Sequence, residues 1–199
     1  QDRDMPRLEG EDAEALLQPA IKKILTAAGD YCYGIDVPDL QTAAVQALRK
    51  KGLTVAAAES CTGGLVAARL TEVPGASAVF GCGIVSYNNT VKAEVLGVDP
   101  AIIEQHTAVS AETAAAMAEA VRKKSGADIG IGVTGNAGPS ASEGQPVGLV
   151  FVAVASEKYS HVSRLFIDRH DADARNLIRH FAALKALSLI LRAAGYYKE

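Results

Sequence analysis

Ala58-Glu59-Ser60-Cys61-Thr62-Gly63-Gly64, at residues 58–64, joins two segments of different character. Before it, residues 53–58 form a short and almost wholly apolar run, which is typical of a buried central strand. After it, residues 65–72 have the spacing of a short helix. Two glycines oppose helix formation by about 1 kcal/mol each, so the stretch is predicted to be a sharp loop. A strand, a tight loop and a helix in this order indicate an α/β fold.

The same alternation of elements continues toward the C-terminus. Further elements are expected as strands at 78–87 and 128–133, a short helix after Asn88-Asn89, a helix from the Ser110 cap through 121, a hairpin of 147–155 and 159–167, and a closing helix at 171–194. Strands joined through helices should be parallel, whereas the hairpin is antiparallel. The prediction is a three-layer α/β/α sandwich with a mixed, mostly parallel sheet and a late antiparallel hairpin.

The segment before residue 37 differs from the rest. Residues 11–28 have apolar positions at helical spacing. A second helix is expected to begin near Asp36 to Pro38, with Asp36 as its cap and Pro38 in its first turn. We therefore divide the chain into an N-terminal appendage or linker, residues 1–36, and a main domain, residues 37–199.

Composition and charge argue against several classes of protein. The net charge is -3, from 20 basic and 23 acidic residues without a long basic run, so we expect no nucleic-acid partner. We also expect no membrane segment and no signal peptide, because no apolar stretch is long and pure enough. The three cysteines lack zinc-site spacing and indicate a reducing cytoplasm. The four histidines are ungrouped, so no metal site is predicted.

The loop at 58–64 is the first candidate site. Backbone N–H groups at the start of a helix can hold an anion or an oxyanion, and glycines allow a ligand to approach them closely. Alternatively, Ser60 or Thr62 is only an N-cap and the glycines ease packing. The residues alone leave these two interpretations equally open.

Residues 86–92 form the second candidate, Ser86-Tyr87-Asn88-Asn89-Thr90-Val91-Lys92. With Asn89 as N-cap, Lys92 occupies the third helical position, at the positive end of the helix dipole. That position should lower the pKa of Lys92, as a lysine acting as a base requires. On spacing alone, a solvated lysine and a core tyrosine are the commoner outcome.

The third candidate is the loop at 134–139, followed by the glycines of residues 144–148. Such turns can bind anions, but they are also ordinary connections between strands. The loops after the first and third strands should meet at the carboxyl edge of the sheet, where ligands bind in such folds. Arg169 and Arg175 lie near the start of the last helix and could hold a phosphate, or could pair with neighbouring aspartates.

These motifs resemble, in family order, those of the CinA C-terminal domain family, which includes the PncC nicotinamide mononucleotide deamidases. The resemblance covers about residues 40–194. Residues 11–36 resemble the segment that joins this domain to an N-terminal nucleotide-binding-like domain in full-length CinA. The matching stretches are residues 58–64, Val85-Ser86-Tyr87-Asn88-Asn89 with Lys92, Ala108-Val109-Ser110, Thr134-Gly135 with Ala137-Gly138-Pro139, Pro146-Val147-Gly148 and Asp168-Arg169.

The resemblance implies an amidohydrolase of pyridine nucleotide salvage, which converts nicotinamide mononucleotide to nicotinate mononucleotide and ammonia. It implies no metal and no organic cofactor. Ser60 would be the nucleophile, with Tyr87 and Lys92 activating it. The residues expected to contact substrate are Cys61, Thr62, Gly63, Gly64, Thr134, Gly135, Ala137, Gly138 and Arg169. The expected protein is a cytoplasmic homo-oligomer whose ligand is a nucleotide.

The sequence departs from the family pattern at two positions, and it leaves two other functions open. Asn136 stands where the family has an aliphatic residue, and Thr107 where a glycine is usual. Both could change substrate binding. The domain could instead be a catalytically silent regulatory or binding module of a competence or DNA-damage protein. It could also be a cysteine hydrolase, with Cys61 as nucleophile and His106 as its base.

Overall fold

The computed structural model describes residues 11–29 and 32–196 of the chain. By its internal contacts the chain divides into two compact units, Gln1–Val37 and Pro38–Glu199. The first contains helix α1 (Glu11–Ala28), where apolar residues at helical spacing predict one. Residues 1–10, Asp30 and Tyr31 belong to the predicted appendage and lie outside the described residues.

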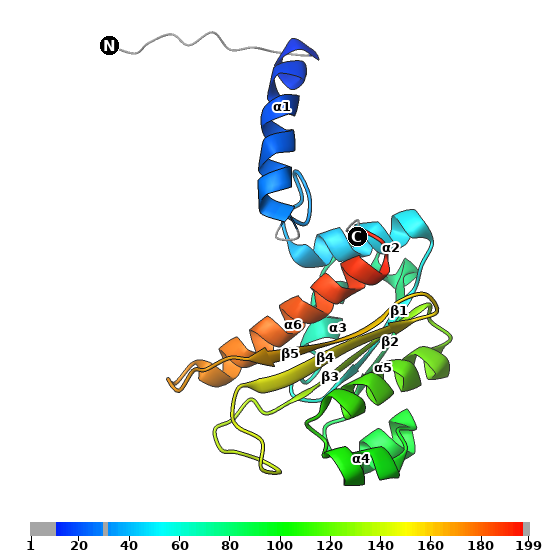
Figure 1. Ribbon diagram of the computed structural model, residues 1–199. Coiled ribbons are helices and arrows are strands. Elements are labelled where there is room, and N and C mark those ends of the chain that lie inside the picture. Colours follow the sequence, from blue (N-terminus) through cyan, green and yellow to red (C-terminus); the bar gives the residue numbers. More distant parts are fainter. Residues whose placement is uncertain (1–10, 30–31, 197–199) are drawn as a thin grey trace. The chain divides into compact units, whose positions relative to one another are not determined.

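The second unit is built on a five-stranded sheet of order β2-β1-β3-β4-β5 (Figure 1). Strand β1 (Val55–Glu59) lies between β2 (Phe80–Val85) and β3 (Ile129–Gly135) and is parallel to both. Strand β4 (Leu149–Ser156) pairs antiparallel with β3 and with β5 (Ser160–Phe166). The predicted mixed sheet with its late hairpin is confirmed.

Helices cover both faces of this sheet. Helix α5 (Ala111–Ser125) packs against β1, β3 and β4 on one face, and α4 (Pro100–His106) packs beside α5 (Figure 1). Three helices cover the other face: α2 (Leu40–Lys51), α3 (Leu65–Thr71) and α6 (Ala174–Ala193). Two short turns, η2 (Ala76–Ala78) and η3 (Val91–Leu96), flank β2. The three-layer α/β/α arrangement is therefore confirmed.

The N-caps of two helices test the sequence predictions directly. Ser110 caps α5 as predicted, because its hydroxyl accepts a hydrogen bond from the Thr113 backbone N–H at 3.1 Å. For α2 the prediction is wrong: Asp39 is the cap, and its carboxylate accepts from the Thr42 N–H at 2.8 Å. Asp36 has a φ of 55°, outside the extended conformation of an N-cap, and Pro38 precedes the helix.

Small residues bring α5 unusually close to the sheet. A Cβ added to Gly130 or Gly132 of β3 would lie 2.0 Å from the Ala118 carbonyl oxygen or 2.2 Å from that of Ala114, both in α5. The neighbouring strand β1 carries three consecutive, fully buried alanines at 56–58. The alanine-rich and glycine-rich composition therefore sets the spacing between sheet and helix.

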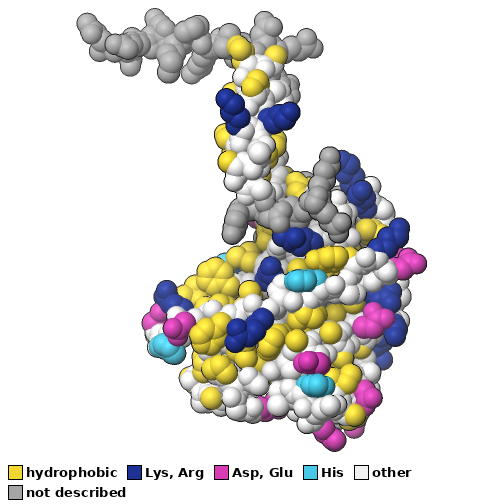
Figure 2. Space-filling view, in the orientation of Figure 1, with side chains coloured by type: hydrophobic (Ala, Val, Ile, Leu, Met, Phe, Trp, Pro, Cys, Tyr) yellow, Lys and Arg dark blue, Asp and Glu magenta, His cyan; other side chains and the backbone are white. Residues whose placement is uncertain are grey.

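The surface of the second unit mixes both signs of charge. On the face shown in Figure 2, Lys and Arg side chains lie interspersed with Asp and Glu. This distribution agrees with the near balance of 20 basic and 23 acidic residues in the sequence. The described helices include none with the length and apolar character needed to cross a membrane.

Candidate active site

A pocket of about 380 Å³ opens where the loops after β1, β2 and β3 meet. This is the carboxyl edge of the parallel strands, where ligands bind in such folds. The predicted site residues that line it are Ser60, Cys61, Tyr87, Lys92, Thr134, Gly135, Ala137 and Gly138. Residues outside that prediction also line it: Asn89, Ala108, Val109, Asn136, Ser140, Ala141, Ser142, Glu143 and Arg175.

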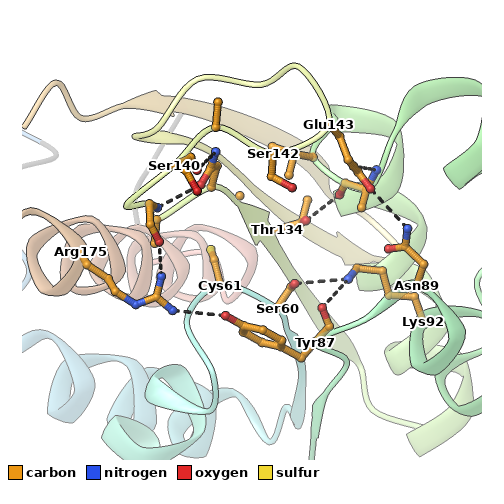
Figure 3. Close-up of a pocket in the computed structure, with 17 residues that line it drawn as sticks. Ser60, Cys61, Tyr87, Asn89, Lys92, Thr134, Ser140, Ser142, Glu143 and Arg175 are labelled. Carbon is orange, nitrogen blue, oxygen red and sulfur yellow. Dashed lines mark hydrogen bonds between the residues drawn. The ribbon is translucent and has the colours of Figure 1, made fainter.

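Ser60 and Lys92 are brought into contact across this edge. The Lys92 Nζ lies 3.2 Å from the Ser60 Oγ (Figure 3). The sheet explains the approach, because β1 and β2 are parallel neighbours that end side by side, with Glu59 opposite Val85. The Ser86 N–H then donates to the Glu59 carbonyl, so the segment after β2 starts beside Ser60.

The Lys92 amine is enclosed by acceptors. Its side chain is only 1% exposed, and Nζ lies 2.9 Å from the Ser86 carbonyl oxygen and 3.5 Å from that of Tyr87. Burial lowers the pKa of Lys92 below its ordinary 10.5, while the charge of Glu143, and that of Cys61 when its thiol is ionised, act in the opposite direction. The site therefore favours the neutral form of an amine that touches a serine hydroxyl.

Lys92 is carried by η3, a single turn of π-helix, a form that recurs at functional sites. The predicted cap Asn89 is wrong. The Asn88 side-chain oxygen accepts from the Val91 N–H at 2.8 Å, and the Asn89 amide instead lies 3.4 Å from the Glu143 Oε1. The direction of the Lys92 pKa shift agrees with the prediction, but its main cause is burial rather than the helix dipole.

Tyr87 contacts Lys92 through its backbone carbonyl, not through its phenol. The phenol oxygen accepts from the Arg175 guanidinium at 3.2 Å, and Tyr87 as a whole is 61% exposed. The same guanidinium donates to the Gly138 carbonyl (Figure 3). Tyr87 and Arg175 thus connect the end of β2, the start of α6 and the loop after β3 into one wall of the pocket.

The Glu59 carboxylate binds the backbone of the glycine loop after Ser60 and of the first turn of α3. The Glu59 side chain is 1% exposed, and its carboxylate accepts from the N–H groups of Gly64, Val66 and Ala67 at 2.9–3.0 Å. The anion that occupies the start of α3 is therefore a carboxylate of this chain. These satisfied donors offset the unfavourable glycines, and three of the N–H groups that could hold a bound anion are already occupied.

Of the four loop residues predicted to contact substrate, Cys61 lines the pocket. Thr62 is fully buried, and Gly63 and Gly64 are not among the lining residues. The φ angles of these glycines are 59° and 94°, which explains the residue type without a ligand. The Gly63 N–H donates to the Ser60 carbonyl, so the loop closes upon itself.

The cysteine alternative finds no support in the geometry. Burial raises the pKa of the Cys61 thiol to about 12, which keeps it in the unreactive protonated form. The proposed base, His106, lies at the end of α4, 3.9 Å from Glu112, and is not a lining residue. Within residues 11–29 and 32–196, no group of three or more His, Cys, Asp or Glu side chains could hold a metal ion.

Asn136, one of the two departures from the family pattern, has a structural role. The Asn136 amide donates to the Ser140 and Gln145 carbonyls at 3.2 and 3.1 Å, and its oxygen accepts from the Gly138 N–H. It therefore organises the loop between β3 and β4. Thr107 has a φ of 70°, a left-handed conformation in which glycine is favoured.

The structure separates the two candidate arginines. The Arg169 guanidinium lies 2.6 Å from the Asp171 carboxylate, and Arg169 is not among the lining residues. Arg175 lines the pocket. Arg175 is a residue that its place near the last helix predicts. Glu143, Ser140 and Ser142 are not predicted, because they lie in a polar stretch of the β3–β4 loop where no motif spacing singles them out.

Comparisons with known proteins identify relatives of this chain. A profile of the CinA C-terminal domain matches residues 38–194. A CinA-like protein of Kosmotoga olearia is 41% identical over 182 residues, which cover 91% of this chain and 43% of that protein. A CinA-like protein of Desulfovibrio desulfuricans is 46% identical over 146 residues, 73% of this chain and 34% of that protein. The chain thus spans less than half the length of these curated relatives.

Solved structures share the fold. The competence/damage inducible protein CihA of Agrobacterium tumefaciens superposes with a TM-score of 0.72 at 34% identity, covering 80% of this chain and 98% of that one. A CinA superfamily protein of Klebsiella pneumoniae gives a TM-score of 0.73 at 28% identity, covering 79% and 97%. Both lines of comparison point to the same family.

Proposed function

This chain belongs to the family of CinA C-terminal domains, and we propose that it hydrolyses the carboxamide of nicotinamide mononucleotide to nicotinate mononucleotide and ammonia. The substrate is inferred from the resemblance of its motifs to those of the PncC deamidases. The observation that carries the reaction type is the contact of a serine hydroxyl with a buried lysine amine, 3.2 Å apart at the base of a pocket.

The surroundings of Lys92 support its role as the base. A neutral amine has two N–H donors and one lone pair. The carbonyl oxygens of Ser86 and Tyr87 can only accept, and so they engage the two N–H groups. The lone pair is then left for the third neighbour, the Ser60 hydroxyl, which can donate its proton.

The reaction follows from this arrangement. Lys92 takes the proton of the Ser60 hydroxyl as the oxygen attacks the carboxamide carbon, and a tetrahedral intermediate forms. Protonated Lys92 then gives that proton to the departing nitrogen, the C–N bond breaks, and ammonia leaves. Lys92 then takes a proton from a water molecule as the water oxygen attacks the resulting ester. It returns this proton to the Ser60 oxygen as the C–O bond breaks, which frees Ser60 and releases the acid, which ionises to the carboxylate.

The walls of the pocket suggest how the substrate is placed. The Cys61 backbone N–H directly follows the nucleophile in a pocket-lining residue, so we assign it to the oxyanion of the intermediate. A phosphate is best matched by Arg175, whose guanidinium sits among the lining residues, together with the N–H groups of the loop after β3. Arg169, held by Asp171, lies outside this set.

The test is ammonia release from nicotinamide mononucleotide by the purified chain, with nicotinate mononucleotide identified as the second product. We expect turnover in the unmodified protein, loss in Ser60→Ala, and retention in Cys61→Ala. Loss in Cys61→Ala with an intact fold would favour the cysteine hydrolase. Tight nucleotide binding without ammonia would favour a silent regulatory module instead.

A further inference from the structure

Glu143 sits at the tip of the β3–β4 loop in a backbone conformation that is unusual for its residue type. Its φ is 53°, and that of Gly144 is 73°. Ser142 and Gln145 pair across this two-residue turn, since the Gln145 N–H donates to the Ser142 carbonyl at 2.9 Å. Turns with two left-handed residues favour Asn or Gly, so a glutamate here is strained. Strain of this kind persists where surrounding contacts fix the residue, often at a functional site.

The surrounding contacts are made by the carboxylate. The Glu143 Oε2 accepts from the Ala108 backbone N–H at 2.8 Å, and Oε1 lies 3.4 Å from the Asn89 amide nitrogen (Figure 3). Ala108 shortly precedes α5, and Asn89 begins the segment that carries Lys92. One side chain therefore joins three segments that are distant in sequence, all of them lining the same pocket.

The charge of this carboxylate also acts on the Lys92 amine. Of the groups that contact Lys92, the Ser60 hydroxyl and the carbonyls of Ser86 and Tyr87 are neutral. The ionisable groups that act on it are Glu143 and the Cys61 thiol. Because burial raises the Cys61 pKa to about 12, that thiol is neutral near pH 7. Glu143 is thus the anion that opposes the effect of burial on Lys92.

We propose that Glu143 is a positioning residue of this site: its carboxylate clasps the β3–β4 loop to Ala108 and Asn89 and so holds together three of the segments that line the pocket of Ser60 and Lys92. The catalytic part of this inference rests on the proposed amide hydrolysis. The clasp itself rests on the hydrogen bonds and the turn geometry.

Glu143→Gln tests the charge, because glutamine keeps an oxygen that can accept from Ala108 but loses the negative charge. Burial of Lys92 is then unopposed, so its pKa falls further. The acidic limb of kcat/KM for ammonia release should therefore move to lower pH. Glu157→Gln, the same change in the turn between β4 and β5, is the matched control and should leave the limb in place. A limb that stays or moves to higher pH in Glu143→Gln would overturn the role of the charge.

Glu143→Ala tests the clasp without reference to activity. In the unmodified protein the Ala108 N–H is held by Glu143, so its hydrogen exchange should be slow. The alanine variant should exchange at Ala108 at least about tenfold faster, the equivalent of one lost charge-assisted hydrogen bond, while its thermal melt shows that the domain is folded. Unchanged exchange would overturn the clasp. If the unmodified chain released no ammonia, the proposed function would fail and this exchange result would still decide the clasp.

Discussion

Ser60 and Lys92 share one proton in the proposed reaction. The losses of activity caused by substituting each residue should therefore not add in the double variant. Ser60→Ala and Lys92→Ala should each lower kcat/KM by at least about 10³-fold, and the double variant by little more, because the residues act as a unit. Lys92→Arg should fail as well, because a guanidinium does not give up its proton near neutral pH. Ammonia release by the four variants, with circular dichroism as the check on folding, measures this. If kcat/KM of the double variant fell by the product of the two factors seen in the single variants, the shared proton would be contradicted.

Burial of Lys92 also predicts a pH dependence of stability. The folded-state pKa lies below 10.5, the ordinary value that applies to the unfolded chain. Between the two values the unfolded state binds more protons, so the unfolding free energy should fall as pH decreases from 10.5 to the folded pKa, and change no further below it. Lys92→Met has no proton to bind and should lack this component. Urea unfolding of both proteins across this pH range measures the difference. As pH falls, the unfolding free energy of the unmodified protein should decrease relative to that of Lys92→Met. Parallel curves would contradict the assignment.

Arg175 is the residue on which phosphate recognition should depend. Losing a charge-assisted hydrogen bond of about 1.5–3 kcal/mol should raise KM for nicotinamide mononucleotide by roughly 10- to 100-fold in Arg175→Ala. Nicotinamide riboside, which lacks the phosphate, should be a far poorer substrate of the unmodified protein and should respond little to the substitution. Arg169→Ala is the matched control. Equal losses on both substrates would show that Arg175 acts on the pocket wall through Tyr87 and not on the phosphate.

At this scale the sequence could identify the centre of the candidate site and part of its lining, but not the contacts that join Arg175 and Glu143 to the rest of the pocket. Ser60 and Lys92 lie in recognisable motifs, and the parallel pairing of β1 with β2 brings them together. Arg175 reaches Tyr87 across 88 residues of sequence, and Glu143 reaches Ala108 across 35. Such contacts depend on how α6 and the β3–β4 loop fold back over the sheet, which local patterns do not encode.

At the scale of elements, the close approach of α5 to β3 should make the glycines of β3 sensitive to substitution. Gly132→Ala places a methyl group 2.2 Å from the Ala114 carbonyl oxygen, which can yield only if the helix moves. The free energy of unfolding should fall by about 3 kcal/mol or more. Gly81→Ala on the edge strand β2 meets nothing within 4 Å and should be neutral or slightly stabilising. Denaturant unfolding of the two variants compares them, and similar stabilities would contradict this account of the packing.

Most elements could be predicted from the sequence, but helix α4 (Pro100–His106) was not among those expected, and element ends could not always be placed. The buried apolar runs that predict β1 and β3 are strong because these central strands are covered on both faces. The caps of α2 and η3 were misplaced because several side chains there could cap equally well. The backbone decides between them: only a side chain that reaches a free N–H two or three residues later acts as the cap.

At the scale of the whole molecule, the pocket belongs to one of the two units. The residues that line it lie between positions 60 and 175, inside the unit Pro38–Glu199. The match to the CinA C-terminal domain covers residues 38–194 and so begins at the same residue as this unit. The unit has its own sheet, its own covering helices and its own buried core. These are the properties of a domain that can fold alone.

Removing residues 1–37 should therefore leave the rate of ammonia release per active site nearly unchanged. The truncated chain 38–199 keeps Ser60, Lys92, Glu143 and Arg175 and the strands and helices that position them. The purified chains 1–199 and 38–199 should be compared for kcat, thermal unfolding and mass in solution. The mass measurement also tests the expected homo-oligomer.

A large loss of kcat in a truncated chain that melts as the chain 1–199 does would mean that the first unit contributes to the site. A loss of kcat accompanied by a smaller mass would mean that the first unit maintains an oligomer on which turnover depends.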